Sequence, residues 1–336
     1  MRKFIIALVL LLGVIFVASR LADLQKIFLT LEQGKWFFVL VAVLLLTAWL
    51  LNIGVFYQII YNLLGMQENL QRLFKLAAAA FFINVVAPMG GVSGISVFLN
   101  DARERRYSSA RVMVAGALFV FFDYIAFLIV LMAGLGALAR RNNLHWPEIS
   151  ASILLALVAV GLGGLLYLGM RSGKTLGIVL ARCSRVANKV LHPFFHREVL
   201  SESRAQDFAL DAEDGLRTLR ARPVDMARLI FVAVVGKILL IGILSMMFLA
   251  FNVPLSPGTL IAGFSIAYLF LIISPTPQGL GFVEGVLTIS LNSMYIPLAE
   301  ATVVVVAYRG VTFWLPLLFG MVSFRTLNRV GVKKPI

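Results

Sequence analysis

Four ionisable residues, Asp123, Lys237, Glu284 and Arg309, lie deep within long apolar stretches of this 336-residue chain. A charged group at membrane depth costs roughly 2.5–3.5 kcal/mol on insertion scales, so such groups face a bundle interior or a wet cavity and form pairs. Asp123 and Arg309 occupy near-equivalent positions in two predicted spans. Their opposite charges predict an ion pair, with either a structural or a functional role. We expect Lys237 to attract a phosphate or to pair with Glu284.

Two of the apolar regions are interrupted by proline and glycine. Residues 274–285 read SPTPQGLGFVEG, and residues 84–94 read NVVAPMGGVSG. Proline prevents a regular helix, and glycine permits positive φ and a close approach of the backbone. Because open backbone in hydrocarbon must be satisfied by protein groups or trapped water, a break at membrane depth indicates a site. We expect Asn84 and Ser274 to satisfy backbone groups that the breaks leave open.

The breaks and the deep charges together predict a substrate-binding site. Its candidate residues are Asn84, Pro88, Gly90, Gly91, Lys237, Pro277, Gly279, Gly281, Glu284 and Arg309, with Asp123 as a structural or coupling charge. Backbone N–H groups at the breaks are suited to cradling a lipid phosphate, and the alternative is close helix packing through small residues. Glu284 begins a predicted helix, and three roles are open for it: capping that helix, exchanging a proton, or binding a cationic group.

The sequence assigns no catalytic residue and no cofactor. One cysteine excludes an intrachain disulfide. With only three scattered histidines in addition, the chain contains no cluster with metal-ligand spacing. We therefore expect neither a metal site nor an organic cofactor.

The elements that position these residues are predicted to be membrane-spanning helices. Hydrophobic residues make up 60% of the chain and charged residues 14%. This composition, with apolar runs longer than about 18 residues, indicates an all-α polytopic membrane protein with one membrane domain over residues 1–336. The net charge of +14 does not indicate nucleic-acid binding, because the basic residues gather where membrane orientation and an anionic lipid surface favour them.

We expect about six full spans and two broken, re-entrant hairpins. The full spans are predicted at residues 4–19, 36–63, 111–138, 150–170, 226–250 and 299–322, and the broken regions at 73–99 and 258–294. For the first span, a cleaved signal peptide is the alternative. Residues 20–35 are expected to form a polar loop. Residues 171–225 are expected to form a cytoplasmic linker, whose amphipathic part suits a helix on an anionic membrane surface.

The distribution of lysine and arginine predicts the orientation. With both termini cytoplasmic and both broken regions re-entrant, 23 of the 30 basic residues fall in cytoplasmic segments, in agreement with the positive-inside rule. If residues 73–99 crossed the membrane fully, the basic cluster that follows would face outward. Under the re-entrant topology, residues 4–138 form one repeat and residues 150–322 an inverted second repeat. Inverted repeats with discontinuous helices that meet near the midplane are a transporter architecture.

The ordered set of motifs resembles the flippase-like transmembrane domain of the lysylphosphatidylglycerol synthase family, over nearly the whole chain. The motifs are Asn84, Pro88 and Gly90, a basic segment and Asp123, then Gly279, Gly281, Glu284, Gly285, Tyr308, Arg309, Trp314, Pro316 and Gly320. The resemblance implies an inner-membrane protein with two re-entrant elements. In fused members this domain moves an aminoacylated lipid between leaflets, and the absence of a soluble aminoacyl-transferase domain here implies a stand-alone member.

One departure from the family pattern concerns the first break. After Pro88 the family often has a Gly-Glu pair, whereas this sequence continues with Gly90 and Gly91. The acid of the first half is therefore missing, and Glu284 in the second break has no counterpart.

These observations support three functions. The first is a flippase-type transporter in the inner (plasma) membrane, which moves a phospholipid, a glycolipid or another lipid-linked headgroup between leaflets. The second is a membrane enzyme acting on a lipid-linked substrate, for which Asp123 and Glu284 are the deep carboxylates. The third is a non-transporting partner of a lipid-modifying synthase, and under this hypothesis such an enzyme is a binding partner.

Overall fold

The computed structural model describes residues 21–86, 94–140, 144, 146–182, 185, 209, 212–213, 216, 223–274 and 276–330. Within these ranges the regular elements are helices and none is a strand, which confirms the all-α class. The first half contains α2 (Leu21–Gln33), α3 (Trp36–Leu63), α4 (Leu70–Val86), α5 (Ile95–Arg105), α6 (Ser109–Arg140) and α7 (Trp146–Arg171). The second half contains α10 (Pro223–Ala250), α11 (Pro257–Ile273), η1 (Pro277–Gly279), α12 (Phe282–Ser293), α13 (Leu298–Arg309), η2 (Gly310–Trp314) and α14 (Leu315–Val330).

Five helices are long and apolar enough to cross a membrane: α3, α6, α7, α10 and the continuous α13–α14. They coincide with the predicted spans at 36–63, 111–138, 150–170, 226–250 and 299–322, which confirms a polytopic membrane protein. The predicted span at 4–19 lies outside the described residues.

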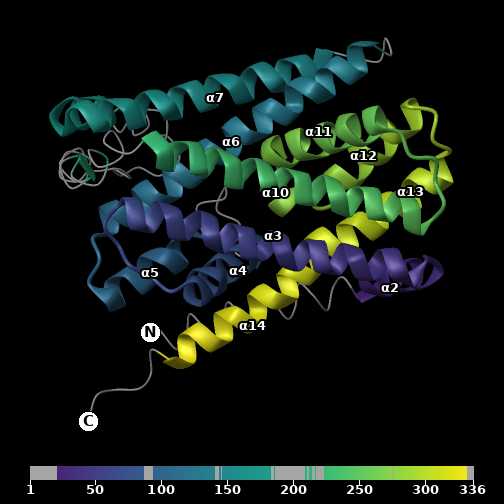
Figure 1. Cartoon of the computed structure of the whole chain (residues 1–336), viewed down its shortest axis with the longest axis horizontal. Coiled ribbons are helices and arrows are strands. Elements are labelled where there is room, and N and C mark those ends of the chain that lie inside the picture. The colour runs from purple at the N-terminus through teal and green to yellow at the C-terminus, as the bar shows by residue number, and fades with distance from the viewer. Residues whose placement is uncertain are drawn as a thin grey trace.

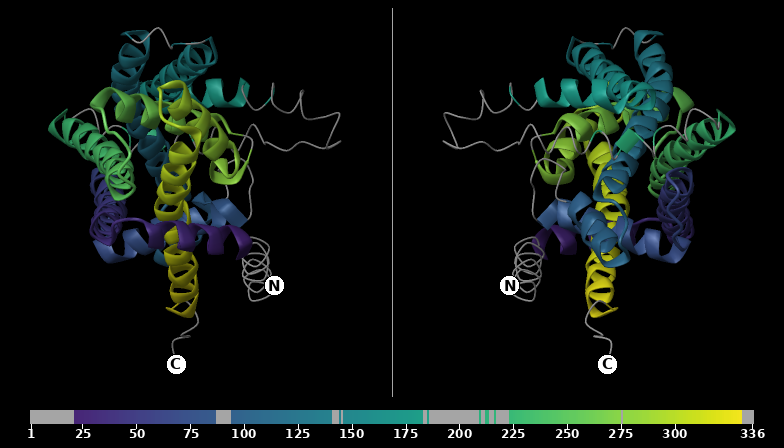
Figure 2. Two further views of the ribbon diagram at one scale, coloured as in Figure 1. Left: turned by 90° about the vertical axis from the view of Figure 1, so that its right-hand side faces the viewer. Right: turned by 90° about the vertical axis from the view of Figure 1, so that its left-hand side faces the viewer.

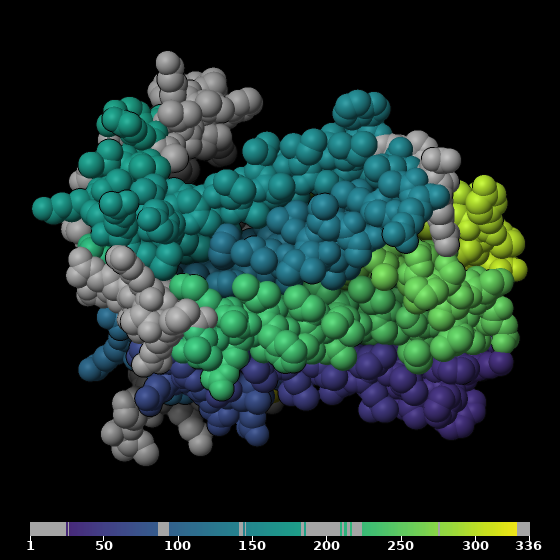
Figure 3. All heavy atoms as spheres, turned by 45° about the horizontal axis from the view of Figure 1, so that its top comes forward, coloured from purple at the N-terminus to yellow at the C-terminus, as the bar shows by residue number. Residues whose placement is uncertain are grey.

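The outer surface of the bundle is apolar. Figure 3 shows α7, α6, α10 and α3 as successive bands along one face. These helices expose large apolar side chains, among them Leu44, Leu157 and Phe231, each more than half accessible. Soluble monomers rarely expose apolar surface on this scale, so the face is suited to contact with lipid tails.

Residues 20–35 do not form the polar loop that we expected. Residues 21–33 form α2, whose apolar residues, including Ile27 and Leu31, recur at helical spacing and give the helix one apolar face. That face packs on α13 and η2, where Ile27 and Leu31 approach Gly310. The expectation was wrong because the apolar residues of this segment recur at helical spacing and allow the helix to pack on the bundle.

The two broken regions enter the bundle from opposite ends. Figure 1 shows α4 and α5 paired at the left end, and α11 and α12 paired at the right end. The second break lies between Ile273 and Phe282 and includes η1. Residues 87–93 of the first break, with Pro88, Gly90 and Gly91, lie outside the described residues.

One long element, α13–η2–α14, passes through the bundle and is crossed by α2 (Figure 2). Pro316 has no N–H for the carbonyl of Thr312, and its ring would clash with that carbonyl in a regular α-helix. The helix widens to a π turn at Gly310–Trp314, immediately before this proline. The π turn begins directly after Arg309, one of the predicted site residues.

The segment predicted as a cytoplasmic linker is described only in part. Residues 173–182 are helical. The side chain of Leu176 is buried and meets Leu216 beside Gly169 of α7. The remaining residues up to 222 lie mostly outside the described ranges, and contact of this segment with a membrane surface stays a prediction.

The second break depends on glycine in the left-handed region. Gly279 has φ +71° and Gly281 has φ +79°. A Cβ atom at Gly281 would meet open space, whereas one at Gly279 would overlap the side chain of Val283, which is buried and β-branched. Both glycines thus adopt the positive φ that we expected, and their part in binding a substrate stays a prediction.

We predict that Gly279→Ala destabilises the protein more than Gly281→Ala. The Gly281→Ala change meets no steric contact, so its cost comes only from the positive-φ backbone, at φ +79° and ψ −37°. The Gly279→Ala change adds overpacking against Val283, typically about 1–3 kcal/mol. Thermal unfolding of the detergent-solubilised variants measures the difference, and an equal loss for both variants would contradict this account of the break.

Candidate functional site

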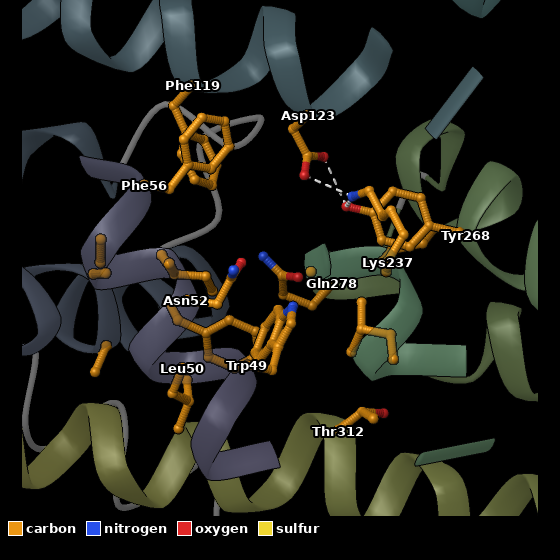
Figure 4. A pocket seen from close by; sticks show the side chains of 18 of the residues that line it. Trp49, Leu50, Asn52, Phe56, Phe119, Asp123, Lys237, Tyr268, Gln278 and Thr312 are labelled. Atoms are coloured by element: carbon orange, nitrogen blue, oxygen red, sulfur yellow. Dashed lines mark hydrogen bonds and ion pairs between the residues drawn. The ribbon is translucent and has the colours of Figure 1, made fainter. Parts of the chain in front are cut away.

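A cavity of about 310 Å³ lies inside the bundle, where the two broken regions meet. Its wall is formed by residues of α3, α4, α5, α6, α10, α11, α12, α13 and both η elements. Polar side chains on the wall belong to Asn52, Asn84, Asp123, Lys237, Gln278, Arg309 and Thr312. Figure 4 shows Asp123 and Lys237 on one side and Thr312 on the opposite side. The rest of the wall is largely aromatic and aliphatic, which is the usual composition of a ligand cavity.

The first charge cluster joins three helices. Nζ of Lys237 on α10 lies 2.6 Å from Oδ1 of Asp123 on α6 and 2.6 Å from the hydroxyl oxygen of Tyr268 on α11. The Tyr268 hydroxyl in turn donates to Oδ2 of Asp123 over 2.9 Å. Lys237 is only 2% exposed, so its ammonium group depends on these partners. The expected pair between Lys237 and Glu284 is therefore wrong.

The second charge cluster fixes the second break. Nε of Arg309 donates to Oε1 of Glu284 on α12 over 2.8 Å. Its Nη2 donates over 2.8 Å to the backbone carbonyl of Gln278 in η1. Oε2 of Glu284 is buried and has no hydrogen-bond partner among the described residues. The predicted ion pair between Asp123 and Arg309 is wrong, since each residue binds an opposite charge from a helix packed directly beside it.

At each break, one described backbone N–H group is satisfied by a nearby side chain, as expected for Asn84 and Ser274. Oδ1 of Asn84 accepts a hydrogen bond from the N–H of Gly94 over 2.6 Å, across the first break. A Cβ atom at position 94 would lie 2.6 Å from Nδ2 of Asn84, so this approach requires glycine. In the second break, Oγ of Ser274 accepts from the N–H of Thr276 over 3.2 Å. Polar side chains thus replace the helical hydrogen bonds that the breaks remove.

The predicted site residues fall into four groups. Asn84, Lys237 and Arg309 line the cavity, together with Asp123. Glu284 is held behind the wall by Arg309. Pro277, Gly279 and Gly281 shape the backbone of the second break. Pro88, Gly90 and Gly91 lie outside the described residues.

The cavity residues that the sequence analysis missed include Trp49, Asn52, Tyr268 and Gln278. Asn52 carries a signal that was available, because an amide in the middle of a 28-residue apolar helix needs a polar neighbour or a cavity. Gln278 lies within the second break and stands between Pro277 and Gly279. Tyr268 and Trp49 give no such signal, since both belong to the ordinary composition of a buried helix.

The fold and the cavity define a multi-pass, all-α membrane protein with a polar chamber between two interrupted helices. The chain belongs to the family of the lysylphosphatidylglycerol synthase TM region, whose model matches residues 4–320. Membership confirms the resemblance found in the sequence and links the chain to the modification or movement of membrane lipids. A comparison with curated proteins gives no match.

We predict an asymmetric response to mutation of the first charge cluster. Asp123→Asn leaves the ammonium group of Lys237 buried without a counter-charge, which costs about 3–5 kcal/mol. Lys237→Met costs less, because the Asp123 carboxylate faces the cavity and keeps the hydroxyl of Tyr268. The double variant Asp123→Asn/Lys237→Met recovers most of the loss. Apparent free energies of unfolding in detergent test the order, and equal losses for both single variants would refute it.

Proposed function

We propose that the protein moves a lipid headgroup between the leaflets of a membrane, as a flippase-type transporter. The observation that carries the proposal is the cavity, whose wall includes residues beside both helix breaks, Asn84 and Gln278. A polar chamber inside an apolar bundle shelters a headgroup from hydrocarbon while the lipid tails stay outside. A phospholipid or a glycolipid is the expected substrate.

We also propose that the two broken pairs are re-entrant and belong to inverted repeats, residues 4–138 and 150–322. The pairs α4–α5 and α11–α12 enter from opposite ends in Figure 1, as repeats related by a two-fold axis in the membrane plane require. In each half, a full span precedes the broken pair and another follows it: α3 and α6 in the first half, α10 and α13–α14 in the second.

The proposed orientation places both termini in the cytoplasm of a cell with an inner (plasma) membrane. Figure 1 shows the C-terminal ends of α5, α7 and α14 and the N-terminal end of α10 at the same end of the bundle. Arg105, Arg171, Arg228 and Arg325 belong to these helix ends. The positive-inside rule assigns such an end to the cytoplasm, where anionic lipid headgroups favour basic side chains.

No specific observation supports either of the other two functions. An enzyme acting on a lipid-linked substrate needs a carboxylate available for proton transfer, but both deep carboxylates are paired with cations, Asp123 with Lys237 and Glu284 with Arg309. The third function, a non-transporting partner of a lipid-modifying synthase, would not require a polar chamber.

We predict that Arg309→Ala and Glu284→Gln lower lipid transfer by about tenfold or more. Each change removes a charged hydrogen bond that fixes the second break, which is worth about 1.5–3 kcal/mol. The measurement is dithionite quenching of fluorescent phospholipids and glycolipids in proteoliposomes. Arg228→Ala is the matched control, because Arg228 forms only an exposed ion pair on the same bundle. Transfer at the wild-type rate by folded Arg309→Ala protein would overturn the site assignment.

Cysteine labelling tests the topology, since Cys183 is the single cysteine. In a Cys183→Ser background, we expect Arg103→Cys in the last turn of α5 to resist a membrane-impermeant maleimide in intact cells. Tyr295→Cys should react, because Tyr295 lies between α12 and α13 and is 93% exposed. Reaction of Arg103→Cys from outside would show that residues 73–99 cross the membrane fully.

A further inference from the structure

Two side-chain amides in the cavity have unused hydrogen-bonding capacity. Asn52 of α3 and Gln278 of η1 point toward one another across the chamber (Figure 4). The side chain of neither residue forms a hydrogen bond with any part of the chain that the structure describes. Both residues are half-buried, so a polar molecule in the chamber can reach their amides, and this facing pair is suited to contact with a ligand.

The backbone holds Gln278 in this position. Its φ and ψ are 52° and 27°, in the left-handed region, and its carbonyl accepts the hydrogen bond from Arg309. Arg309 thus acts as a positioning residue for the amide. On the other side, a Cβ atom at Gly236 would lie 3.0 Å from Oδ1 of Asn52, so glycine leaves room for the Asn52 side chain.

The charges around the chamber compensate one another. Lys237 is neutralised by Asp123, and Arg309 by Glu284. Residues 87–93, next to the chamber in sequence, include no ionisable side chain. A phosphate entering the chamber would therefore find no uncompensated cation among the described residues. An amide both donates and accepts hydrogen bonds, which matches hydroxyl and amide groups better than a phosphodiester, which only accepts.

We infer that Asn52 and Gln278 bind the uncharged, hydroxyl- or amide-bearing part of a lipid headgroup, such as a sugar, while the phosphate stays outside the amide pair. This inference rests on the proposed transport function and specifies its substrate class. Under this inference, the two amides determine which headgroup binds. The ion pairs Asp123–Lys237 and Glu284–Arg309 hold the cavity walls in place.

Binding is measured on the full chain in nanodiscs through the fluorescence of Trp49, which lines the cavity. The Trp49→Phe variant supplies the background signal from the other tryptophans. The probes are hexyl glucoside, dihexanoylphosphatidylcholine and dihexanoylphosphatidic acid, each below its micellar concentration. Methyl glucoside distinguishes a free sugar from a lipid-linked one. We expect hexyl glucoside to bind more tightly than each of the other three probes.

Asn52→Leu and Gln278→Met should each weaken hexyl glucoside binding about threefold to tenfold, the loss of one neutral hydrogen bond. Asn62→Leu on the same helix and Gln71→Met on α4 are matched controls, because both amides are exposed and lie outside this cavity. Unchanged binding in both amide variants, or tighter binding of dihexanoylphosphatidic acid, overturns the inference. Methyl glucoside binding as tightly as hexyl glucoside also overturns it, in favour of a soluble ligand.

The same preparation separates this inference from the proposed function. If the wild type binds hexyl glucoside but transfers no labelled lipid in proteoliposomes, transport fails and the amide assignment stands. If it transfers lipid while the amide variants bind and transfer normally, transport stands and the amide assignment fails.

Discussion

A charge inside an apolar bundle must have a partner, and this requirement organises the cavity walls. Lys237 is almost completely buried, and it brings Asp123 and Tyr268 from two other helices to within hydrogen-bonding distance. Arg309 does the same for α12 and the second break. Removing one partner from such a pair costs far more than the pair contributes on balance. The pairs therefore fix which helices can be neighbours.

The same logic applies to the backbone at the breaks. An interrupted helix exposes N–H and C=O groups that hydrocarbon cannot satisfy, so the chain needs side chains or a wet cavity beside each break. The side chain of Asn84 accepts a hydrogen bond from the N–H of Gly94, and that of Arg309 donates one to the carbonyl of Gln278. A proline or glycine break at this depth is thus tolerated only where polar side chains converge. That convergence is what produces a polar chamber within an apolar bundle.

The sequence predicted the bounds of the helices better than it predicted which side chains pair with one another. Apolar length determines a span, and the ends predicted for α3 and α10 lie within a few residues of those observed. The depth of Asp123 and Arg309 along their helices was also readable, but depth does not say which way a side chain points around the helix axis. For that reason the Asp123–Arg309 pair was wrong. Tyr268 was missed because nothing in its sequence context separates a hydrogen-bonding tyrosine from a packed one.

The observed pairing suits the proposed transport function better than the predicted one. A bridge from Asp123 to Arg309 would have joined α6 to α13, two helices that both line the chamber but do not pack closely on one another. Opening the chamber would then break a buried ion pair, at a cost of several kcal/mol. In the observed arrangement each pair joins helices that already pack together, α6 with α10 and α12 with α13. The walls can then separate while these charges keep their partners, and the facing amides of Asn52 and Gln278 hold no hydrogen bond within the described chain that such a movement would break.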